Sequence, residues 1–428
     1  MTEEAAARPA SSAAPARSVA LGALVIVGIV GWVGLLWIGA TLYAATPPKA
    51  GFDLELLLRA GRDVAAGRSP YDPALVAGTA PVAESLFYSY PPLVAQVMAA
   101  FAAIPSPVML VAWDAAAVAG LAAVAVALAR RFAPDLPSRS VALPVVALAP
   151  LCFPFAIGLL FGNLDVFFPL LYGAMLLAVA PGTTSAVQGA GGVALATAAI
   201  AKLHPGSLGV WFGVRGLGGD RPSGRVFLVA LGIGLAVLVA SVLVGGLTGW
   251  TDYVAVVRAG SSADLVDPRN AGPAAQVALL LGAGDGFART TQIVVSLGVL
   301  AVTLLAARRG GDPVERLGWA AAASLATLPV TWFHYPSAMI PFGLVALFRG
   351  WGTPAAGRVR LLIAIALVVA AVAIAFLPLI WVAIGLVLAA TRASVQAASP
   401  GSESAEPAGP IRSDLHQLDD PNGAIVSP

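Results

Sequence analysis

Long apolar runs separated by short polar breaks follow one another along almost the whole chain. The first run extends from Ser18 to about Ala45 and ends before Pro47-Pro48. A helix that crosses a bilayer needs roughly 20 mostly apolar residues, so this run predicts a spanning helix. The pattern as a whole predicts an all-α polytopic integral membrane protein with about 11–13 transmembrane helices. Further apolar runs cover about 89–104, 108–129, 140–161, 164–180, 188–213, 226–247, 291–307, 317–332, 335–348 and 359–391.

Two of these runs are interrupted. The run 188–213 contains Lys202-Leu203-His204-Pro205, where a charge and a proline favour a turn between two half-length segments. The run 359–391 is long enough for two short spans with a break near Pro378.

The composition excludes a soluble globular protein. Hydrophobic residues make up 59% of the 428 residues and charged residues only 11%, whereas about 25% of a soluble domain is charged. The first run is nearly twice as long as the roughly 7–15-residue core of a signal peptide, which favours an uncleaved anchor. Residues 1–17 and 394–428 are predicted to be disordered cytoplasmic tails. Residues 18–393 then form one membrane domain.

The chemistry-bearing residue types are scarce. Cys152 is the only cysteine and there are three histidines, so a disulfide framework and a cysteine-based metal cluster are excluded. The sequence has no phosphate-binding loop, dinucleotide fingerprint, zinc motif or serine triad. The net charge of +2 gives no basic face for nucleic acid. We therefore predict no cofactor, no metal site and no nucleic-acid partner, and leave dependence on a divalent metal open.

Two polar segments stand between the apolar runs. The segment 46–87 is the densest charged stretch before the C-terminal tail, and 248–290 is the second. Within the first, helical spacing from Asp53 to Ala66 predicts an amphipathic helix lying at the membrane interface. Its apolar face is formed by Leu54, Leu57, Leu58 and Gly61.

The arginines predict the orientation of the chain. Basic residues concentrate in cytoplasmic loops, and four loops carry the arginine groups 130/131/139, 215/221/225, 308/309/316 and 349/358/360. All four loops face the cytoplasm together with the N-terminus if 89–104 does not cross fully and 188–213 turns back at Lys202–Pro205. A plain twelve-span count instead places Arg130 and Arg131 outside. The first arrangement gathers the polar interruptions on the outer face.

Asp53 lies just beyond the first span, at the membrane–water boundary. A carboxylate there is suited to act as general base on a hydroxyl group. The alternative is a solvated residue at the start of a helix, where negative charge is favoured.

Four other polar groups sit at breaks between apolar runs. Lys202 and His204 favour an anionic ligand such as a phosphate, because ionisable groups within membrane segments are functional candidates. The Asn163–Asp165 segment suits either sugar hydroxyls or a tight turn. Both Tyr90 and the 332–335 segment (Trp-Phe-His-Tyr) suit either carbohydrate stacking or interfacial anchoring.

Six elements in order resemble glycosyltransferase family 87 of the GT-C superfamily, the bacterial polyprenol-phosphate-mannose-dependent mannosyltransferases. The resemblance covers about Gly51 to Pro341. The family places an aspartate after the first anchor and then has Gly-x-x-x-Tyr, Phe-x-Tyr-Pro-Pro-Leu, Gly-Gln-x-Asn, Lys-x-x-Pro, Asn-Gln-Ser and either Trp-x-His-His or Trp-x-His-Tyr. The corresponding residues here are Asp53, Gly67–Tyr71, Tyr88–Leu93, Gly162–Asp165, Lys202–Pro205, Arg269–Gly272 and Trp332–Tyr335. The sequence departs from the pattern in several places: Tyr88 stands in the Phe place, Gly-Asn-x-Asp replaces Gly-Gln-x-Asn, Asn270 lacks the following Gln-Ser, and Leu57 stands where a tyrosine is usual.

The resemblance implies a GT-C-like bundle that transfers a sugar from a polyprenyl-phosphate donor to a lipid-linked or cell-envelope glycan. Mannose is the family default, and arabinofuranose is the alternative. Asp53 would be the base in an inverting displacement on the outer face of the bacterial cytoplasmic membrane. The implied donor-phosphate residues are Arg59, Lys202, His204 and His334. The implied acceptor or sugar residues are Tyr90, Asn163, Asp165, Asn270, Trp332 and Tyr335.

Two other classes of function stay open at this point. A polytopic transporter or flippase often has repeated halves and midplane charges, and this chain has no clear repeat. A non-catalytic subunit that binds a polyprenyl phosphate is the third hypothesis. An inverting transferase needs the Asp53 carboxylate, whereas neither of the others does.

Overall fold

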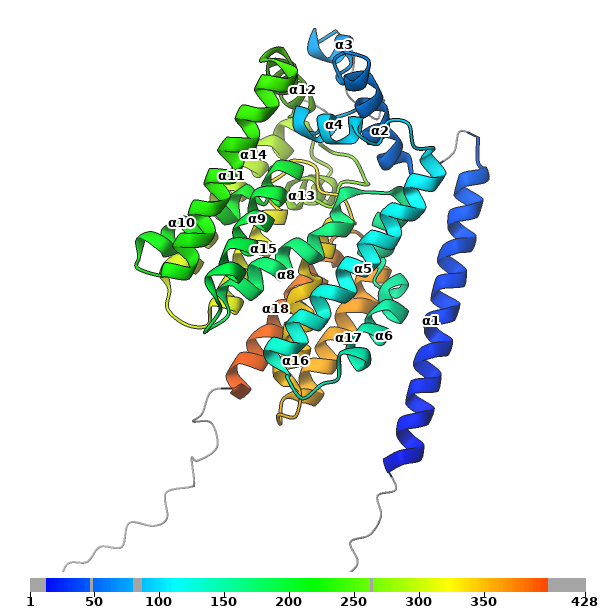
Figure 1. The fold of residues 1–428 in the computed structure, drawn as a ribbon, viewed down its shortest axis with the longest axis vertical. Coiled ribbons are helices and arrows are strands. Elements are labelled where there is room, and N and C mark those ends of the chain that lie inside the picture. The colour runs from blue at the N-terminus through cyan, green and yellow to red at the C-terminus, as the bar shows by residue number, and fades with distance from the viewer. Residues whose placement is uncertain (1–12, 47–48, 80–86, 262–264, 399–428) are drawn as a thin grey trace, which may run out of the picture.

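The computed structural model describes residues 13–46, 49–79, 87–261 and 265–398. The described residues form helices joined by short connections, with no strand among them (Figure 1). The prediction of an all-α polytopic membrane protein is therefore confirmed.

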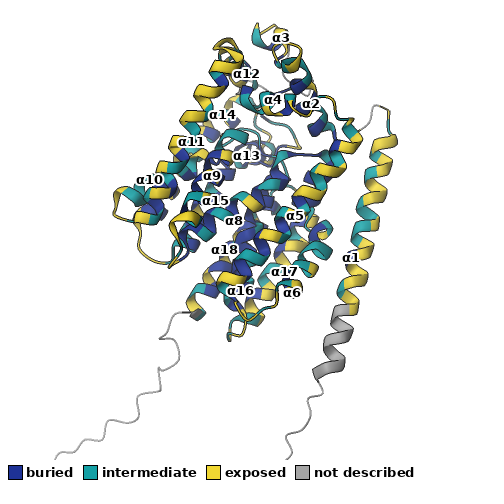
Figure 2. Ribbon diagram, viewed as in Figure 1, coloured by how far each residue is buried: buried dark blue, intermediate teal, exposed yellow. Residues whose placement is uncertain are grey.

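Five of the described helices are long and apolar enough to cross a membrane. Much of the surface of these helices is exposed. In α1 and in α11, only 11% of the most apolar stretch is buried in the protein. Figure 2 shows this contrast between exposed α1 and the buried centre of the bundle. These helices are α1 (Ala13–Ala44), α5 (Ser106–Phe132), α11 (Arg221–Gly245), α14 (Asp285–Arg308) and α18 (Leu379–Ala398).

A bent pair supplies a sixth crossing if it is counted as one span. Helix α6 (Ser138–Leu148) continues through η1 (Ala149–Leu151), and the chain then bends by 74° into α7 (Phe153–Phe161). The number of about 11–13 spans was predicted by treating every apolar run as a crossing. Several of those runs fold as helices that are shorter than a bilayer is thick.

The shorter apolar helices pair into hairpins whose turns carry buried polar residues. Residues Asp165, Lys202 and His334 each lie at one of these turns and are at most 8% exposed. Irregular backbone at membrane depth is tolerated where protein surrounds it. The hairpins are α7/α8 (Phe168–Val179, after η2, Leu164–Phe167), α9/α10 (Ser185–Ala201 and Gly206–Leu217) and α15/α16 (Pro313–Leu325 and Ile340–Gly350, with η3, Tyr335–Met339, between them).

The predicted turn at Lys202–Pro205 is confirmed, since α9 ends at Ala201 and α10 begins at Gly206. The predicted break near Pro378 is also present, between α17 (Ala356–Val372) and α18. The run 89–104 contains only the eight-residue helix α4 (Pro92–Ala99), which is too short to cross.

A cap of short helices covers one end of the bundle (Figure 1). The predicted amphipathic helix is α2 (Phe52–Ala65), and its predicted apolar face is buried. It packs with α3 (Pro73–Val76), α4 and α12 (Thr248–Ser261) around one apolar cluster. At Gly61 a Cβ atom would lie 2.5 Å from the backbone carbon of Met98, so only glycine permits this approach of α2 to α4.

The four arginine-bearing connections lie at the end of the bundle opposite this cap. They follow α5, α10, α14 and α16; in Figure 1 the ends of α5 and α16 lie at the bottom of the bundle and the end of α10 at its left, all away from the cap. The arrangement matches the topology in which the 188–213 segment turns back.

One predicted loop and the ends of two predicted helices differ from what was expected. The segment 248–290, expected as a loop, contains α12 and α13 (Pro273–Leu281), and α14 begins within it. Helix α1 already begins at Ala13 and α18 continues to Ala398. The rest of the two expected tails, residues 1–12 and 399–428, lies outside the described residues.

Candidate active site

The first turn of α2 docks on the end of α7. The amide of Gly51 donates to the carbonyl of Leu160 at 2.8 Å, and the rings of Phe52 and Phe161 lie 4.7 Å apart. Gly162 ends α7 with a φ of 65°, and a Cβ there would lie 2.6 Å from the Cβ of Leu54. A glycine is therefore required where α2 reaches the α7–α8 turn, and this contact brings Asp53 to Asn163.

Asn163 links the α7–α8 turn to Asp53. Its Oδ1 accepts from the backbone N–H of Asp165 at 2.9 Å, which caps η2. Its Nδ2 then donates to Asp53 Oδ2 at 2.6 Å. The indole Nε1 of Trp113, on α5, donates to the backbone carbonyl of Asn163 at 3.4 Å. Because the cap fixes which side of the amide is the acceptor, Asn163 presents a donor to Asp53.

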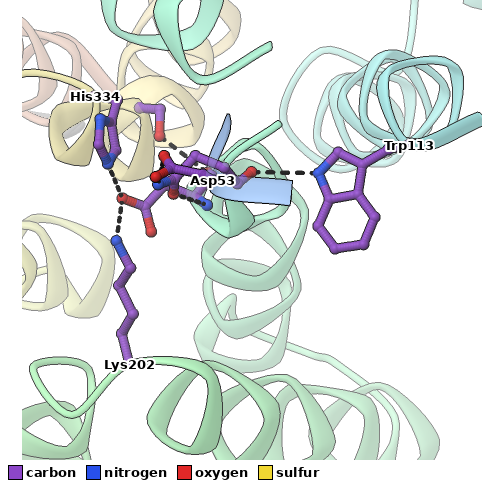
Figure 3. A network of polar contacts seen from close by, with 7 residues as sticks. Asp53, Trp113, Lys202 and His334 are labelled. Carbon is purple, nitrogen blue, oxygen red and sulfur yellow. Dashed lines mark hydrogen bonds and ion pairs between the residues drawn. The ribbon is translucent and has the colours of Figure 1, made fainter. Parts of the chain in front are cut away.

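Lys202 and His334, labelled in Figure 3, come from two other hairpin turns and both contact Asp165. Lys202 Nζ lies 2.8 Å from Asp165 Oδ2, with both side chains almost fully buried. His334 Nε2 lies 3.3 Å from the same oxygen, without hydrogen-bond geometry. Ser337 Oγ donates to the backbone carbonyl of Asp165 at 3.0 Å. The ion pair offsets the cost of burying either charge alone.

Aromatic rings pack beside Lys202. Its ammonium lies 3.9 Å from the centre of the Tyr335 ring, a cation–π contact. The His204 ring stacks on Tyr335 with centroids 5.6 Å apart, and Phe168 lies 5.6 Å from His204 on another side. Neither ring nitrogen of His204, nor of His334, has a hydrogen-bond partner within the described part of the chain. These buried nitrogens are ready to bind a polar ligand.

The environment of Asp53 favours its protonated form more than water does. Burial raises the pKa of Asp53 to about 6, while the hydrogen bond from Asn163 and the charge of Lys202 oppose this shift. A carboxylate with a pKa near neutrality is a better general base than an exposed one. Burial also raises the pKa of Tyr90, and Lys202 again opposes the shift, which couples Tyr90 to the same cluster.

Three predicted site residues take other positions. Arg59 lies on the exposed side of α2. Trp332 packs partly buried against the main core. Asn270 is 1% exposed, and its amide bonds the backbone of Leu265, Gly272, Pro329 and Thr331. Asn270 therefore fixes the segment that leads into His334 instead of opening toward the cluster.

Sequence reasoning missed Trp113 and Ser337. Ser337 lies three residues after His334, so proximity to that motif was an available signal. Trp113 stands inside an apolar run, where the only available signal was the charged residue Asp114 that follows it. Among the described residues, no group of three or more histidine, cysteine, aspartate or glutamate side chains is placed to hold a metal ion.

The comparison with family models decides the class of protein. The model of glycosyltransferase family 87 matches residues 88–332, which is more than half of the chain. The chain belongs to glycosyltransferase family 87. No curated protein and no solved structure matches it.

Membership of family 87 makes the chain a membrane glycosyltransferase and separates it from the transporter and the non-catalytic subunit. The matched segment contains Asn163, Asp165, Lys202 and His204. Asp53 precedes the matched segment, and His334 follows it by two residues. In the structure, both residues lie beside the residues of the matched segment.

Proposed function

We propose that this family 87 glycosyltransferase moves a sugar from a polyprenyl phosphate to a hydroxyl group of a lipid-linked or cell-envelope glycan. Asp53 removes the proton of the acceptor hydroxyl. The acceptor oxygen forms a bond with the anomeric carbon as the bond from that carbon to the phosphate oxygen breaks. The electron pair leaves with the polyprenyl phosphate, and the configuration of the anomeric carbon is inverted.

The observation that carries this proposal is the hydrogen bond from Asn163 to a partly buried Asp53, 2.6 Å long. The bond orients one carboxylate oxygen and leaves the other for an acceptor hydroxyl. The pKa of about 6 keeps the group mostly ionised at neutral pH and still basic enough to accept a proton.

The leaving phosphate is assigned to Lys202 with the two buried histidines. A lysine ammonium has three N–H donors, and Asp165 occupies one of them. The remaining donors, with the unpartnered nitrogens of His204 and His334, suit phosphate oxygens in a poorly hydrated site. Asp165 then acts by holding Lys202 in position instead of binding sugar. Arg59, on the exposed side of α2, is kept as a secondary candidate for the approaching phosphate.

The sugar and the acceptor are assigned to the aromatic and amide groups around Asp53. The Tyr335 ring lies against Lys202, and Tyr90 is close enough to interact electrostatically with it, which agrees with a sugar held between the base and the phosphate. Mannose is the donor sugar we propose first, and arabinofuranose is the alternative. The site faces the outer side of a bacterial cytoplasmic membrane, because the cap lies opposite the arginine-bearing connections.

The test uses membranes containing the full chain, labelled polyprenyl-phosphate mannose, and the variant Asp53→Asn. Loss of the base should lower transfer by about 100- to 10,000-fold. The matched control is Asp63→Asn, on the same helix, whose carboxylate pairs with Arg68; it should keep wild-type transfer.

Each outcome separates one part of the proposal. Equal transfer by wild type and Asp53→Asn would exclude Asp53 as the base. Transfer from the arabinofuranose donor alone would replace mannose. Absence of transfer from both lipid donors would overturn the polyprenyl-phosphate assignment.

A further inference from the structure

A pocket with charged residues in its lining lies at the end of the bundle opposite Asp53. It has a volume of about 300 Å³ and is formed between the α10–α11 connection and the end of α14. Its charged lining consists of Arg215, Asp220, Arg308 and Arg309. None of these residues belongs to the cluster around Asp53 and Lys202.

One wall of the pocket is rigid. Arg215 Nη2 lies 2.6 Å from Asp220 Oδ2, and its guanidinium carbon lies 5.0 Å from the centre of the Trp211 ring. Asp220 also accepts from the backbone N–H and the hydroxyl of Ser223, which caps α11. The carboxylate is therefore engaged on two sides, and Arg215 is held in one orientation. These contacts use Nε and Nη2, so the N–H donors of Nη1 are not needed for the pairing with Asp220.

The other wall carries positive charge without a compensating acid. Arg308 is the last residue of α14 and Arg309 follows it, and both are exposed. No ion pair with either is present in the described chain, and the nearby Asp312 pairs with Arg349 at 2.9 Å. With Asp220 neutralising Arg215, the pocket carries two uncompensated charges, which suits an anion.

Exposed leucines stand next to the lining residues in the sequence. Leu217, which precedes the lining residue Gly218, is 92% exposed, and Leu305, one turn before the lining residue Arg308, is 49% exposed. A free phosphate would gain nothing from these side chains, whereas the acyl chains of a lipid would cover them. Basic pockets between membrane helices on the cytoplasmic side are suited to anionic headgroups.

We propose that this pocket binds the phosphodiester headgroup of an anionic phospholipid, with its acyl chains against Leu217 and Leu305. The phosphate lies between Arg215 on one wall and Arg308 and Arg309 on the other. The site is independent of the sugar-transfer reaction.

The test titrates the purified full-length protein with phosphatidylglycerol and with phosphatidylcholine and counts bound lipids by native mass spectrometry. Wild type should bind the anionic lipid more tightly than the neutral one. The double variant Arg308→Gln/Arg309→Gln should weaken phosphatidylglycerol binding by about 30-fold, since each arginine near a membrane surface contributes about 1 kcal/mol.

The matched control is Arg358→Gln/Arg360→Gln, which removes two exposed arginines at the same end but outside the pocket. It should keep wild-type affinity. An equal loss in both double variants would indicate diffuse attraction and overturn the pocket. Equal binding by wild type and Arg308→Gln/Arg309→Gln would also overturn it. Competition by glycerol 3-phosphate at the lipid's own concentration would replace the lipid with a free phosphate.

Discussion

The long and the short helices of this protein differ in exposure and in the polar residues they carry. The long helices α1 and α11 expose most of their apolar surface, and none of the clustered polar groups lies on them. The shorter helices pair as α7/α8, α9/α10 and α15/α16, and the turns at which they meet carry the buried residues Asn163, Asp165, Lys202 and His334. An unbroken helix satisfies its own backbone in lipid, whereas an interrupted one must be surrounded by protein. The interruptions are therefore where buried polar groups gather.

The strongest test of this contrast removes the charge at one buried turn. Lys202→Met leaves Asp165 buried without its cation, which should cost about 3–5 kcal/mol of folding free energy and abolish use of the lipid donor. Thermal unfolding of the purified protein and donor kinetics measure the two effects. The double variant Lys202→Met/Asp165→Asn removes both charges and should regain most of the stability but none of the activity. Recovery of activity in the double variant would exclude Lys202 from phosphate binding.

A glycine pair compares packing in the two kinds of helix directly. At Gly192, in α9, a Cβ would lie 2.8 Å from the backbone oxygen of Val226 and 2.6 Å from the Cβ of Val229. At Gly34, in α1, a Cβ would meet nothing within 4 Å. Gly192→Ala should lower stability by about 1–3 kcal/mol, while Gly34→Ala should leave the unfolding midpoint unchanged or raise it. Equal midpoints for the two variants would contradict the contrast.

The pH dependence of transfer reports on the turn at Asn163. Since a general base must be deprotonated, kcat/KM should fall as the pH drops below about 6, the pKa of Asp53. The Asn163 hydrogen bond lowers that pKa, so Asn163→Ala should move the acid limb to higher pH. Trp113→Phe removes only the indole contact to the Asn163 carbonyl and should leave the limb in place. An unmoved limb in Asn163→Ala would remove Asp53 from the titration.

The proposed orientation places the cap outside the cell and the arginine-bearing connections in the cytoplasm. Single cysteines test it with the smallest perturbation. In a Cys152→Ser background, Ala66→Cys lies at the cap end and Gly357→Cys at the arginine end, both at exposed positions. We expect an impermeant maleimide to label Ala66→Cys in intact cells and Gly357→Cys only after permeabilisation. The reverse pattern would place the cap in the cytoplasm.

Local patterns predicted single elements well. Helical spacing predicted α2 and its buried face, and a charge beside a proline predicted the turn between α9 and α10. Both features are determined by a few neighbouring residues. The segment 248–290 was harder, because the nine-residue helix α13 is too short to be distinguished from a loop by hydropathy.

Long-range pairing was not predictable from the same patterns. The sequence interpretation assigned Asp165 to sugar and Lys202 to phosphate, whereas the two side chains form one ion pair. They are 37 residues apart, and only the packing of two hairpins brings them together. Trp113 was missed for the same reason, since its partner Asn163 lies on a distant turn.

The shared carboxylate of Asp165 has a consequence for biogenesis. During synthesis the chain emerges from its N-terminus, so Asp165 enters the membrane before Lys202, and His334 comes last. Until α9 and α10 are complete, the α7–α8 turn has a carboxyl group but no cation, and insertion is favoured with that group protonated or near the aqueous boundary. The hairpins are therefore expected to settle in a fixed order, with the second one allowing the first to reach its final depth.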